Sequence, residues 1–358
     1  MKVLHIINSL QTGGAEKLIV DSVPIYQSKG IDTDVILLKK STTDFYTKLE
    51  NTSTGKLFSL STGSVYSPLL IFKIIPFLKN YDLVHVHLFP SSYWVVLAKM
   101  LSFSKIKIIY TEHSTNNRRR ENKFFQIIDK IIYKYFEDII CITQGAKEKL
   151  EQHIGTNYPI SVINNGIVVK DFYQTKTKEI QKNSTKKEFT LIQVSSFRGA
   201  KDQATVIKSL THLEDKVKLV LVGTGQKIED CKKLVSELNL QNRVSFLGNR
   251  YDIPYLLANS DVVILSSNFE GFGLSIVEGM AANKPCIASD IEGIREIVSG
   301  FGLLFEKGNS KHLSEIILEL YQNQEFYTKI ANQCFTRAND FDIEKMVDDY
   351  IKIYNNRT

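Results

Sequence analysis

The strongest constraint on the fold is a repeated alternation of short, β-branched apolar runs with segments of helical length. In the first half of the chain these runs occupy residues 2–7, 34–38, 83–87, 106–110 and 138–143. In the second half they occupy residues 189–194, 218–222, 244–247, 261–265, 285–288 and 303–305. Strands separated by helices predict parallel sheets covered by helices, so the expected class is α/β with doubly wound sheets.

The length of 358 residues exceeds what one hydrophobic core usually organises, and it indicates two domains of about 150 to 200 residues each. Residues 168–188 are dominated by Lys, Thr, Asn and Gln, and such a polar stretch marks the boundary. Apolar residues at helical spacing from Ile343 to Tyr354 predict an amphipathic helix that lies on one of the domains. The default ligand site is then the cleft between the domains, at the carboxyl ends of strands.

Composition places the chain among packed soluble proteins, since 43% of its residues are hydrophobic and 23% are charged. The four cysteines stand far apart, which disfavours a zinc site and a disulfide framework and fits a reducing compartment. No apolar run reaches the roughly 18 residues of a membrane span, and residues 1–10 lack the pattern of a signal peptide. We therefore expect a cytoplasmic protein.

Positive charge is concentrated in the first half of the chain. Residues 1–170 carry a net charge of +7 and residues 171–358 one of −1, within a total of +6. This asymmetry indicates an anionic partner. Nucleic acid is disfavoured because no recognisable DNA- or RNA-binding module interleaves the basic residues with aromatic side chains, whereas an anionic membrane surface attracts the same charge.

Paired glycines follow the first expected strand. Gly13 and Gly14 precede a helical pattern that starts at Lys17, so a ligand could approach the backbone and an anion could meet the first N–H groups of the helix. The dinucleotide fingerprint GxGxxG is absent, which argues against an NAD enzyme. A plain tight turn is the alternative interpretation.

A denser cluster follows the expected strand at residues 261–265. The segment EGFGLSIVEGMA, residues 270–281, starts as a glycine-punctuated loop and continues as a helix from about Leu274. Glu270 would lie in the loop and Glu278 one turn into the helix, whose first N–H groups would face an anion. Phosphate suits these N–H groups, and carboxylates accept hydrogen bonds from the hydroxyls of a polyol. The alternative is that Glu278 lies on a solvated helix face.

The motifs taken together resemble glycosyltransferase family 4. Glu270 and Glu278, with seven residues between them, resemble the E-x7-E signature of these retaining enzymes. Further matching segments occur along the chain: Gly13-Gly14-Ala15-Glu16, Asn165-Gly166, Leu219-Val-Leu-Val-Gly223-Thr-Gly225, Val244-Ser-Phe-Leu-Gly248, Lys284-Pro285 and Gly293-Ile-Arg-Glu-Ile297. Each motif alone is weak, whereas their order and spacing together are specific.

The resemblance implies the GT-B fold, in which two Rossmann-like domains face each other across a cleft and the second holds most of a nucleotide-sugar donor. We expect an acceptor-side domain over residues 1–166 and a donor domain over residues 167–340. The terminal helix, residues 341–358, would cross back to the first domain. No cofactor or metal is expected, since no aspartate pair suited to Mg²⁺ appears.

Roles for individual residues follow from the same resemblance. Glu278 would accept hydrogen bonds from the ribose, and Glu270 would balance positive charge at the anomeric carbon. Lys201 matches the lysine that stabilises the leaving diphosphate, and His113 matches the histidine beside the donor sugar. The expected catalytic residues are therefore Glu270, Lys201 and His113. Further donor contacts are expected from Gly13, Gly14, Arg198, Arg250, Gly271, Phe272, Gly273, Leu274 and Ser275.

One family position differs in this chain. The family usually has an arginine five residues before the lysine, where this chain has Ser196. Arg198 stands two positions later and would have to reach the phosphates from there.

The remaining histidines are assigned structural places. His85 and His87 alternate along one strand and are expected to face opposite sides of it, which makes them a poor pair of metal ligands. His5, in the first strand, is expected to be a core histidine.

A basic segment precedes an amphipathic pattern in the first half. Arg118, Arg119 and Arg120 stand before apolar residues that recur at helical spacing from Phe124 to Tyr135. An anionic membrane surface or an acceptor diphosphate is one interpretation. A solvated helix whose apolar face packs on its own sheet is the other.

These features together predict a retaining glycosyltransferase that moves a sugar from a nucleotide diphosphate, with UDP favoured, to a hydroxyl of a lipid-linked or saccharide acceptor in cell-surface polysaccharide synthesis. It would act in the cytoplasm or peripherally at the inner face of the membrane. Residues 42–67 and 116–125 are candidate acceptor loops. A nucleotide-sugar epimerase of GT-B fold and a non-catalytic sugar-nucleotide binder are the alternatives.

Overall fold

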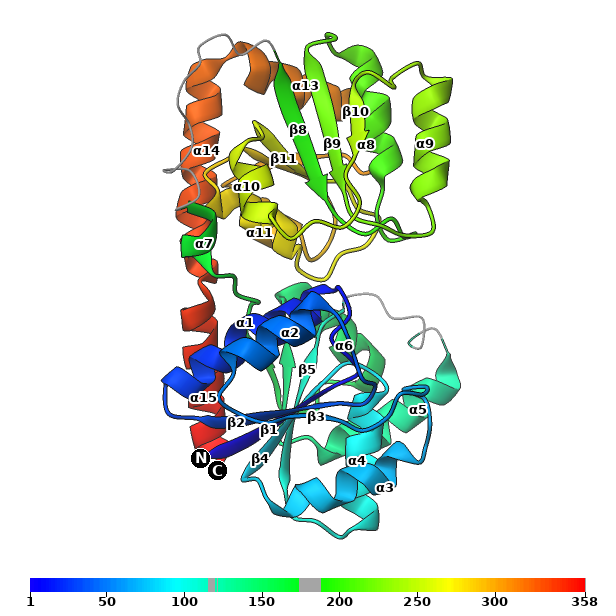
Figure 1. Ribbon diagram of the computed structural model, residues 1–358, viewed down its shortest axis with the longest axis vertical. Coiled ribbons are helices and arrows are strands. Elements are labelled where there is room, and N and C mark those ends of the chain that lie inside the picture. Colours follow the sequence, from blue (N-terminus) through cyan, green and yellow to red (C-terminus); the bar gives the residue numbers. More distant parts are fainter. Residues whose placement is uncertain (115–119, 121, 174–187, 358) are drawn as a thin grey trace. The chain divides into compact units, whose positions relative to one another are not determined.

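A computed structural model describes residues 1–114, 120, 122–173 and 188–357 of the chain. The chain divides into two compact units (Figure 1). The first unit comprises residues 1–166 and 343–358, and the second comprises residues 167–342. Each unit has its own parallel sheet.

The first unit is built on a seven-stranded sheet with the order β3-β2-β1-β4-β5-β6-β7. The strands are β1 (Lys2–Ile7), β2 (Asp32–Leu37), β3 (Leu57–Ser59), β4 (Leu83–His87), β5 (Lys107–Glu112), β6 (Asp138–Cys141) and β7 (Ile160–Val162). The direction of winding reverses between β1 and β4, so carboxyl ends of neighbouring strands frame the point where ligands bind in such sheets.

Helices cover both faces of this sheet, because its strands present apolar side chains on alternate sides. Ile7 and Val35 pack on one face against Ile19 of α1, while Leu4 and Ile6 belong to a separate core on the other face. The helices of the unit are α1 (Gly14–Ser28), α2 (Asp44–Thr52), α3 (Leu70–Ile74), α4 (Ser91–Leu101), α5 (Lys123–Ile132), α6 (Gln144–Ile154) and α15 (Ile343–Arg357).

The second unit is built on a six-stranded parallel sheet with the order β10-β9-β8-β11-β12-β13. Its strands are β8 (Phe189–Val194), β9 (Val217–Val222), β10 (Val244–Phe246), β11 (Val262–Leu265), β12 (Cys286–Ser289) and β13 (Leu303–Phe305). Its helices are α7 (Val169–Tyr173), α8 (Gln203–Ser209), α9 (Ile228–Glu237), α10 (Ile253–Ala258), α11 (Leu274–Ala281), α12 (Arg295–Val298), α13 (Ser310–Gln322) and α14 (Gln324–Ala338).

The predicted α/β class with two doubly wound parallel sheets is confirmed. Every expected strand is present, and the structure adds β3 and β7. Each of these added strands has three residues, none of them buried, at an edge of the first sheet. The equally short edge strands β10 and β13 were predicted, and each of them has one buried apolar residue.

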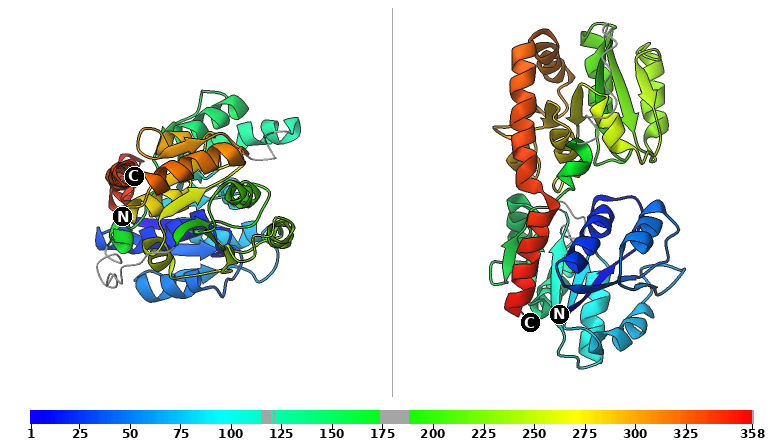
Figure 2. Two further views of the ribbon diagram at one scale, coloured as in Figure 1. Left: turned by 90° about the horizontal axis from the view of Figure 1, so that it is seen from above. Right: turned by 60° about the vertical axis from the view of Figure 1, so that its left-hand side comes forward.

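The last helix, α15, packs on the first unit, and Figure 2 shows it beside that unit. Its Tyr350 and Tyr354 are buried and bond to strands β5 and β4. The Tyr354 hydroxyl lies 2.6 Å from Nδ1 of His85, and the Tyr350 hydroxyl lies 3.2 Å from Oγ1 of Thr111. At its end, Arg357 pairs with Asp138 at 3.0 Å. The helix therefore completes the core of the first unit.

Gly166 lies where the chain meets the start of α15. A Cβ at this position would lie 2.6 Å from Cα of Ile343, which is closer than real Cβ contacts. Its N–H donates to the Met346 sulfur over 3.2 Å. A glycine is therefore required by close approach of two backbones.

We expect Gly166→Ala to lower the free energy of unfolding of the first unit by about 1 to 3 kcal/mol, because the added methyl overpacks against backbone. Urea unfolding followed by fluorescence of Trp94, the single tryptophan, measures this unit. Gly63→Ala, in the same unit, is the control, since its added Cβ would meet nothing closer than the Ser61 hydroxyl oxygen at 3.4 Å. Equal unfolding midpoints for the two variants would contradict the steric argument.

Candidate active site

Two loops of the second unit are joined by backbone bonds at the carboxyl ends of β8 and β11. The N–H of Asn268 donates to the carbonyl of Ala200 over 2.8 Å. Lys201 and Ser267 form an isolated antiparallel bridge beside it. The backbone thereby brings Lys201 next to the loop that carries Glu270.

A third loop limits the position of Glu270. Gly293 has a φ of 81°, and a Cβ there would overlap the carbonyl oxygen of Glu270. Glycine alone combines this left-handed backbone with so close an approach. The packing thus accounts for the glycine of the Gly293-Ile-Arg-Glu-Ile297 motif.

Lys201 and Glu270 form an ion pair through Nζ and Oε2. Only 17% and 18% of their side-chain surfaces are exposed, so solvent and salt screen the pair weakly. The other carboxylate oxygen of Glu270, Oε1, accepts a hydrogen bond from the N–H of Gly271 over 3.2 Å. A cation and an anion are therefore held side by side at the start of the glycine-rich loop.

Helix α11 begins directly after this loop without a side-chain cap. Gly273 at its amino end has a left-handed backbone, with φ 84° and ψ 54°. The first N–H groups of a helix have no intrahelical acceptor, so an uncapped end can receive an anion. Glu278 lies one turn into α11 and is 5% exposed, which excludes the solvated helix face that was the alternative for this residue.

Phe272 serves the core of the second unit through its side chain. It is 2% exposed, and its ring packs edge-on against Phe341 with 5.3 Å between centroids. Only its backbone is left to contact a ligand.

The two arginines expected near the donor lie in different surroundings. Arg198 is exposed and its side chain makes no hydrogen bond or ion pair within the described ranges. Arg250 pairs with Asp252 through Nη2 at 2.5 Å, which raises the pKa of the guanidinium. The Ser196 carbonyl accepts a hydrogen bond from Gln203 over 3.1 Å. Arg198 is thus the arginine in this loop whose side chain can turn toward an anion.

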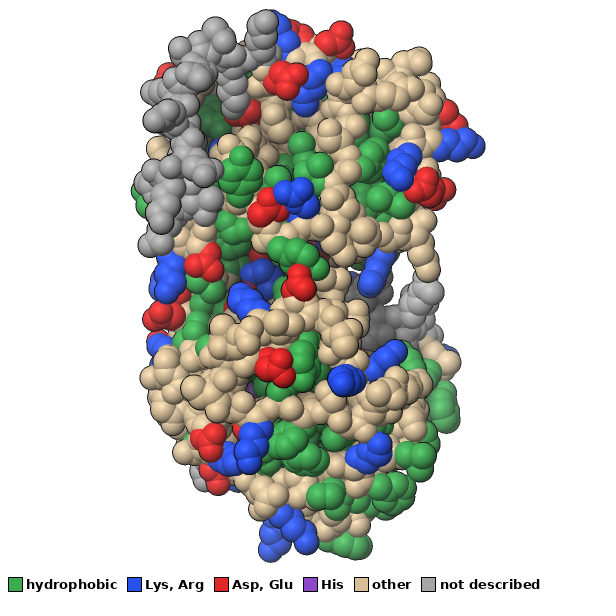
Figure 3. Space-filling model, viewed as in Figure 1, with side chains coloured by type: hydrophobic (Ala, Val, Ile, Leu, Met, Phe, Trp, Pro, Cys, Tyr) green, Lys and Arg blue, Asp and Glu red, His purple; other side chains and the backbone are tan. Residues whose placement is uncertain are grey.

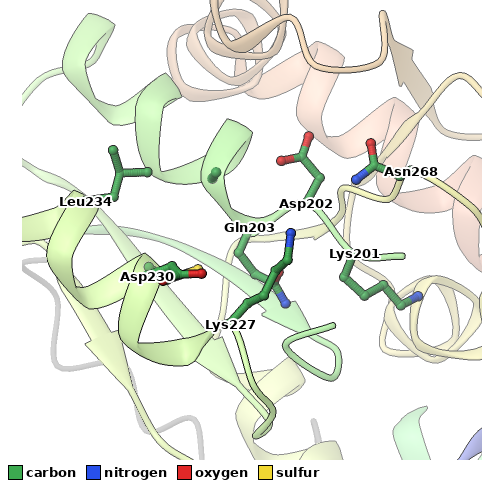
Figure 4. Close-up of a pocket in the computed structure, with 9 residues that line it drawn as sticks. Lys201, Asp202, Gln203, Lys227, Asp230, Leu234 and Asn268 are labelled. Atoms are coloured by element: carbon green, nitrogen blue, oxygen red, sulfur yellow. The ribbon is translucent and has the colours of Figure 1, made fainter. Parts of the chain in front are cut away.

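A pocket lies beside Lys201, between α8 and α9 (Figure 4). Of the expected site residues only Lys201 lines it. The lining residues are Lys201, Asp202, Gln203, Ala204, Lys227, Asp230, Cys231, Leu234 and Asn268. The expected donor residues of α11 take no part in this pocket.

The expected residues of the first unit also lie at carboxyl ends of strands. Gly13 has an extended backbone, with φ −167° and ψ 165°, and stands at the amino end of α1 without a side-chain cap. Gly14 is the first residue of α1. His113 follows β5, so these residues occupy the same edge of the first sheet.

His85 and His87 lie on one face of β4, so the expectation that they face opposite sides is wrong. Their ring centroids are 4.1 Å apart. Residues two apart in a strand point to the same face, which is the physical reason for the correction. The same rule could have placed His87 beside the neighbouring strand's His113, a contact that the sequence analysis missed. His5 is 1% exposed, as expected for a core histidine.

Burial keeps these histidines neutral. It lowers the pKa of His113 to about 4 and that of His5 to about 3. It also lowers the pKa of His85 and of His87 well below the ordinary value. At neutral pH each ring therefore carries one proton, on Nδ1 or Nε2.

The basic segment does not present Arg120 to a membrane. Arg118 and Arg119 lie outside the described residues. Arg120 pairs with Glu112 at 2.9 Å and exposes 12% of its side chain. The expectation that Arg120 contacts an anionic surface is therefore wrong, because its charge is engaged by a buried carboxylate.

Helix α5 exposes apolar residues and buries a charged one. Phe124, Ile127 and Ile131 are 66%, 62% and 51% exposed, whereas Asp129 is fully buried. The Asp129 carboxylate accepts a hydrogen bond from Tyr93 and lies 2.8 Å from Nε2 of His153. Figure 3 shows hydrophobic side chains gathered over the part of the first unit formed by α3, α4 and α5. Helix α5 thus has apolar residues on both sides: Ile128 and Ile132 pack on the core together with the bonded Asp129, and three apolar residues face outward.

No described helix has the length and apolar character that a membrane span requires.

Comparison with known proteins identifies two matching family models. The model described as Glycosyltransferase Family 4 matches residues 12–171, and the model described as Glycosyl transferases group 1 matches residues 174–336. Together they cover most of both units, without α15.

Similar proteins match over most of their length. N-acetyl-alpha-D-glucosaminyl L-malate synthase of Bacillus anthracis is 27% identical over 285 residues, or 77% of this chain and 75% of that protein. A Campylobacter jejuni enzyme, N-acetylgalactosamine-N,N'-diacetylbacillosaminyl-diphospho-undecaprenol 4-alpha-N-acetylgalactosaminyltransferase, is 25% identical over 97% of both chains. The crystal structure of Anabaena HepE in complex with UDP and glucose has a TM-score of 0.87 at 24% identity and covers 99% of both chains.

Proposed function

Because the chain belongs to the family 4, group 1 glycosyltransferases and has their GT-B fold, we propose that it is a retaining enzyme that transfers a sugar from a UDP-sugar to a hydroxyl of a lipid-linked or saccharide acceptor. The reaction would contribute to cell-surface polysaccharide synthesis. UDP is favoured because the similar HepE structure holds it. A polyprenyl-linked acceptor is favoured by the name of the Campylobacter relative, and the name of the Bacillus relative adds malate as an acceptor to test.

The observation that carries the proposal is the Lys201–Glu270 pair beside the uncapped end of α11. A diphosphate bound at that helix end would draw the Lys201 ammonium away from Glu270 and leave the carboxylate beside the sugar. Glu278, buried one turn further on, would accept hydrogen bonds from the ribose. The diphosphate, the sugar and the ribose thus each have a partner of suitable chemistry within two adjoining loops and one helix.

In the proposed reaction the acceptor oxygen attacks the anomeric carbon on the face from which the diphosphate leaves. The bond from that carbon to the phosphate oxygen breaks, and the departing oxygen takes the acceptor's proton. Lys201 and the N–H groups of Leu274 and Ser275 stabilise the negative charge on the diphosphate, while Glu270 stabilises positive charge on the sugar. His113 donates a hydrogen bond to a sugar hydroxyl.

We expect UDP, and neither GDP nor ADP, to raise the melting temperature of the protein, since a ligand of the folded state stabilises it by mass action. Glu278→Gln should weaken UDP binding by about tenfold to hundredfold, because the ribose loses a charged acceptor. Isothermal titration calorimetry measures the affinity. Glu319→Gln, an exposed glutamate of α13, is the matched control. Unchanged UDP affinity in Glu278→Gln would refute the role of Glu278.

We expect Lys201→Gln to lower kcat about 100-fold or more, because the developing negative charge loses its cation. Glu270→Gln should also lower kcat while leaving UDP affinity unchanged. Lys227→Gln is the matched lysine control, since Lys227 lines the neighbouring pocket (Figure 4). Release of an altered sugar without acceptor would instead support an epimerase, and UDP-sugar binding without turnover would support a binding protein.

We propose further that the outer surface of α5 holds the first unit on an anionic bilayer. This α5 surface comprises Phe124, Ile127, Ile131, Lys123 and Lys130, all exposed. Within α5 the single acidic residue is the buried Asp129, so every exposed charge on this helix is positive. Apolar residues flanked by lysines suit a surface of anionic lipid, and a lipid-linked acceptor would be presented there.

We expect the wild-type protein to sediment with vesicles of phosphatidylcholine and phosphatidylglycerol, and less at high salt. The double variant Phe124→Glu, Ile127→Glu should bind at least about tenfold more weakly, since two apolar side chains no longer leave water. Tyr255→Glu, at a residue of the second unit that is 46% exposed, is the control. Equal sedimentation of both variants would exclude the α5 surface, and binding to a second copy of the chain would appear as dimerisation without vesicles.

A further inference from the structure

Three histidines of the first unit form a hydrogen-bonded chain. Nδ1 of His5 lies 3.1 Å from Nε2 of His87. Nδ1 of His87 lies 3.2 Å from Nε2 of His113. The chain therefore runs from β1 across β4 to the residue that follows β5.

The two ends of this chain are buried nitrogens without a partner. Nε2 of His5 and Nδ1 of His113 have no hydrogen bond within the described parts of the protein. Buried polar atoms are nearly always paired, so an unpaired atom at each end of one chain calls for an explanation.

The hydrogen bonds make the three tautomers interdependent. A neutral imidazole has one donor nitrogen and one acceptor nitrogen, and each N···N contact needs one of each. Either all three rings carry the proton on Nδ1, or all three carry it on Nε2. In the first state His113 presents a free N–H at Nδ1, and in the second state His5 holds a free N–H at Nε2.

The surroundings favour the first state. His5 is 1% exposed, so an N–H at its Nε2 would lie in the core without an acceptor. Orphaned buried N–H groups are rare in proteins. His113 follows β5 at the carboxyl edge of the sheet and is partly exposed as a residue, so a ligand hydroxyl at this edge can supply the acceptor that its buried Nδ1 lacks.

We propose that His87 and His5 are positioning residues that hold His113 with its proton on Nδ1, ready to donate to a hydroxyl of the donor sugar. This proposal rests on the role of His113 in the proposed function. It explains both unpaired nitrogens: Nδ1 of His113 is a donor whose acceptor is the sugar hydroxyl, and Nε2 of His5 is an unprotonated nitrogen in the core.

The neighbouring His85 stands outside the chain. Its Nδ1 and Nε2 bond to Tyr354 and Thr111 at 2.6 and 2.7 Å. His5, His85 and His87 are close enough to hold a metal ion, with one ligand atom from each within 4.8 Å of the others. Five of their six ring nitrogens already have a hydrogen-bond partner. A metal would have to break these bonds, so the geometry favours the hydrogen-bonded chain.

Nitrogen NMR of the full-length protein labelled with ¹⁵N-histidine, free of substrate, measures the tautomer directly. The sequence has seven histidines, and His113→Gln identifies the signals of His113 by their loss. We expect Nδ1 of His113 to be protonated and Nε2 unprotonated at pH 7. The opposite tautomer in the wild type would overturn the proposal.

His5→Phe is the most informative variant, because His5 bonds to His87 and has no hydrogen bond to His113. We expect the His113 signals to shift toward a mixture of tautomers. Tyr354→Phe removes a buried hydroxyl from the same core without touching the chain, and it should leave these signals unchanged. A folded His5→Phe protein with unchanged His113 signals would refute the coupling.

Two substitutions at His87 keep the test open if His5→Phe does not fold. His87→Asn places an amide N–H near the position of Nδ1 and should preserve the His113 tautomer. His87→Gln places its amide nearer Nε2, toward His5, and should lose it. Identical His113 signals in the two variants would contradict the positioning role.

Kinetics separate this proposal from the function on which it rests. We expect kcat to be about tenfold lower in His87→Gln than in His87→Asn, the loss of one hydrogen bond in the transition state. Full turnover in His113→Gln would refute the role of His113, while the NMR result would still report whether the chain sets its tautomer.

Discussion

Parallel pairing of strands is the constraint on which every candidate functional residue depends. In a parallel sheet all strands end at the same edge, and each connection must return along a face covered by helices. The residues that follow strands are therefore collected together without any attraction between them. In the first unit this places Gly13 and His113 at one edge, and in the second it places Lys201 beside Glu270. Side-chain chemistry then acts within a geometry that backbone hydrogen bonds have set.

The sequence predicted those parts of the molecule that depend on local pattern. Apolar runs revealed the strands that bury side chains, including the short edge strands β10 and β13, whereas β3 and β7 were missed because none of their three residues is buried. The burial of Glu278 could not be derived, since helical spacing alone does not say which side packs. Arg120 was misjudged because an ion pair with Glu112, eight residues earlier in the chain, leaves no local pattern in the sequence. His87 was expected on the side of the strand opposite His85, whereas residues two apart in a strand point to the same side.

The orientation of helix α5 depends on a buried carboxylate as well as on apolar packing. Burying a carboxylate is unfavourable unless hydrogen bonds replace its water. Tyr93 and His153 supply these bonds to Asp129 and thereby fix the rotation of the helix about its axis. On the same side of the helix Ile128 and Ile132 pack on the core, while Phe124, Ile127 and Ile131 stay exposed. The orientation of α5 is thus set by the bonds to Asp129 together with the burial of one of its apolar sides.

The chain leaves the first unit after Gly166 and returns to it only at Ile343. During synthesis on the ribosome, the part of the sheet that Tyr350 and Tyr354 cover stays open until residues 343–357 emerge. The second unit, continuous in the chain, can mature while the first still waits for its last helix. A chain that stops before Ile343 would therefore leave apolar residues of the first unit uncovered, although the missing residues are far from that unit in the sequence. Chaperones and proteases would then meet an incompletely packed first unit, although most of that unit is synthesised before the second.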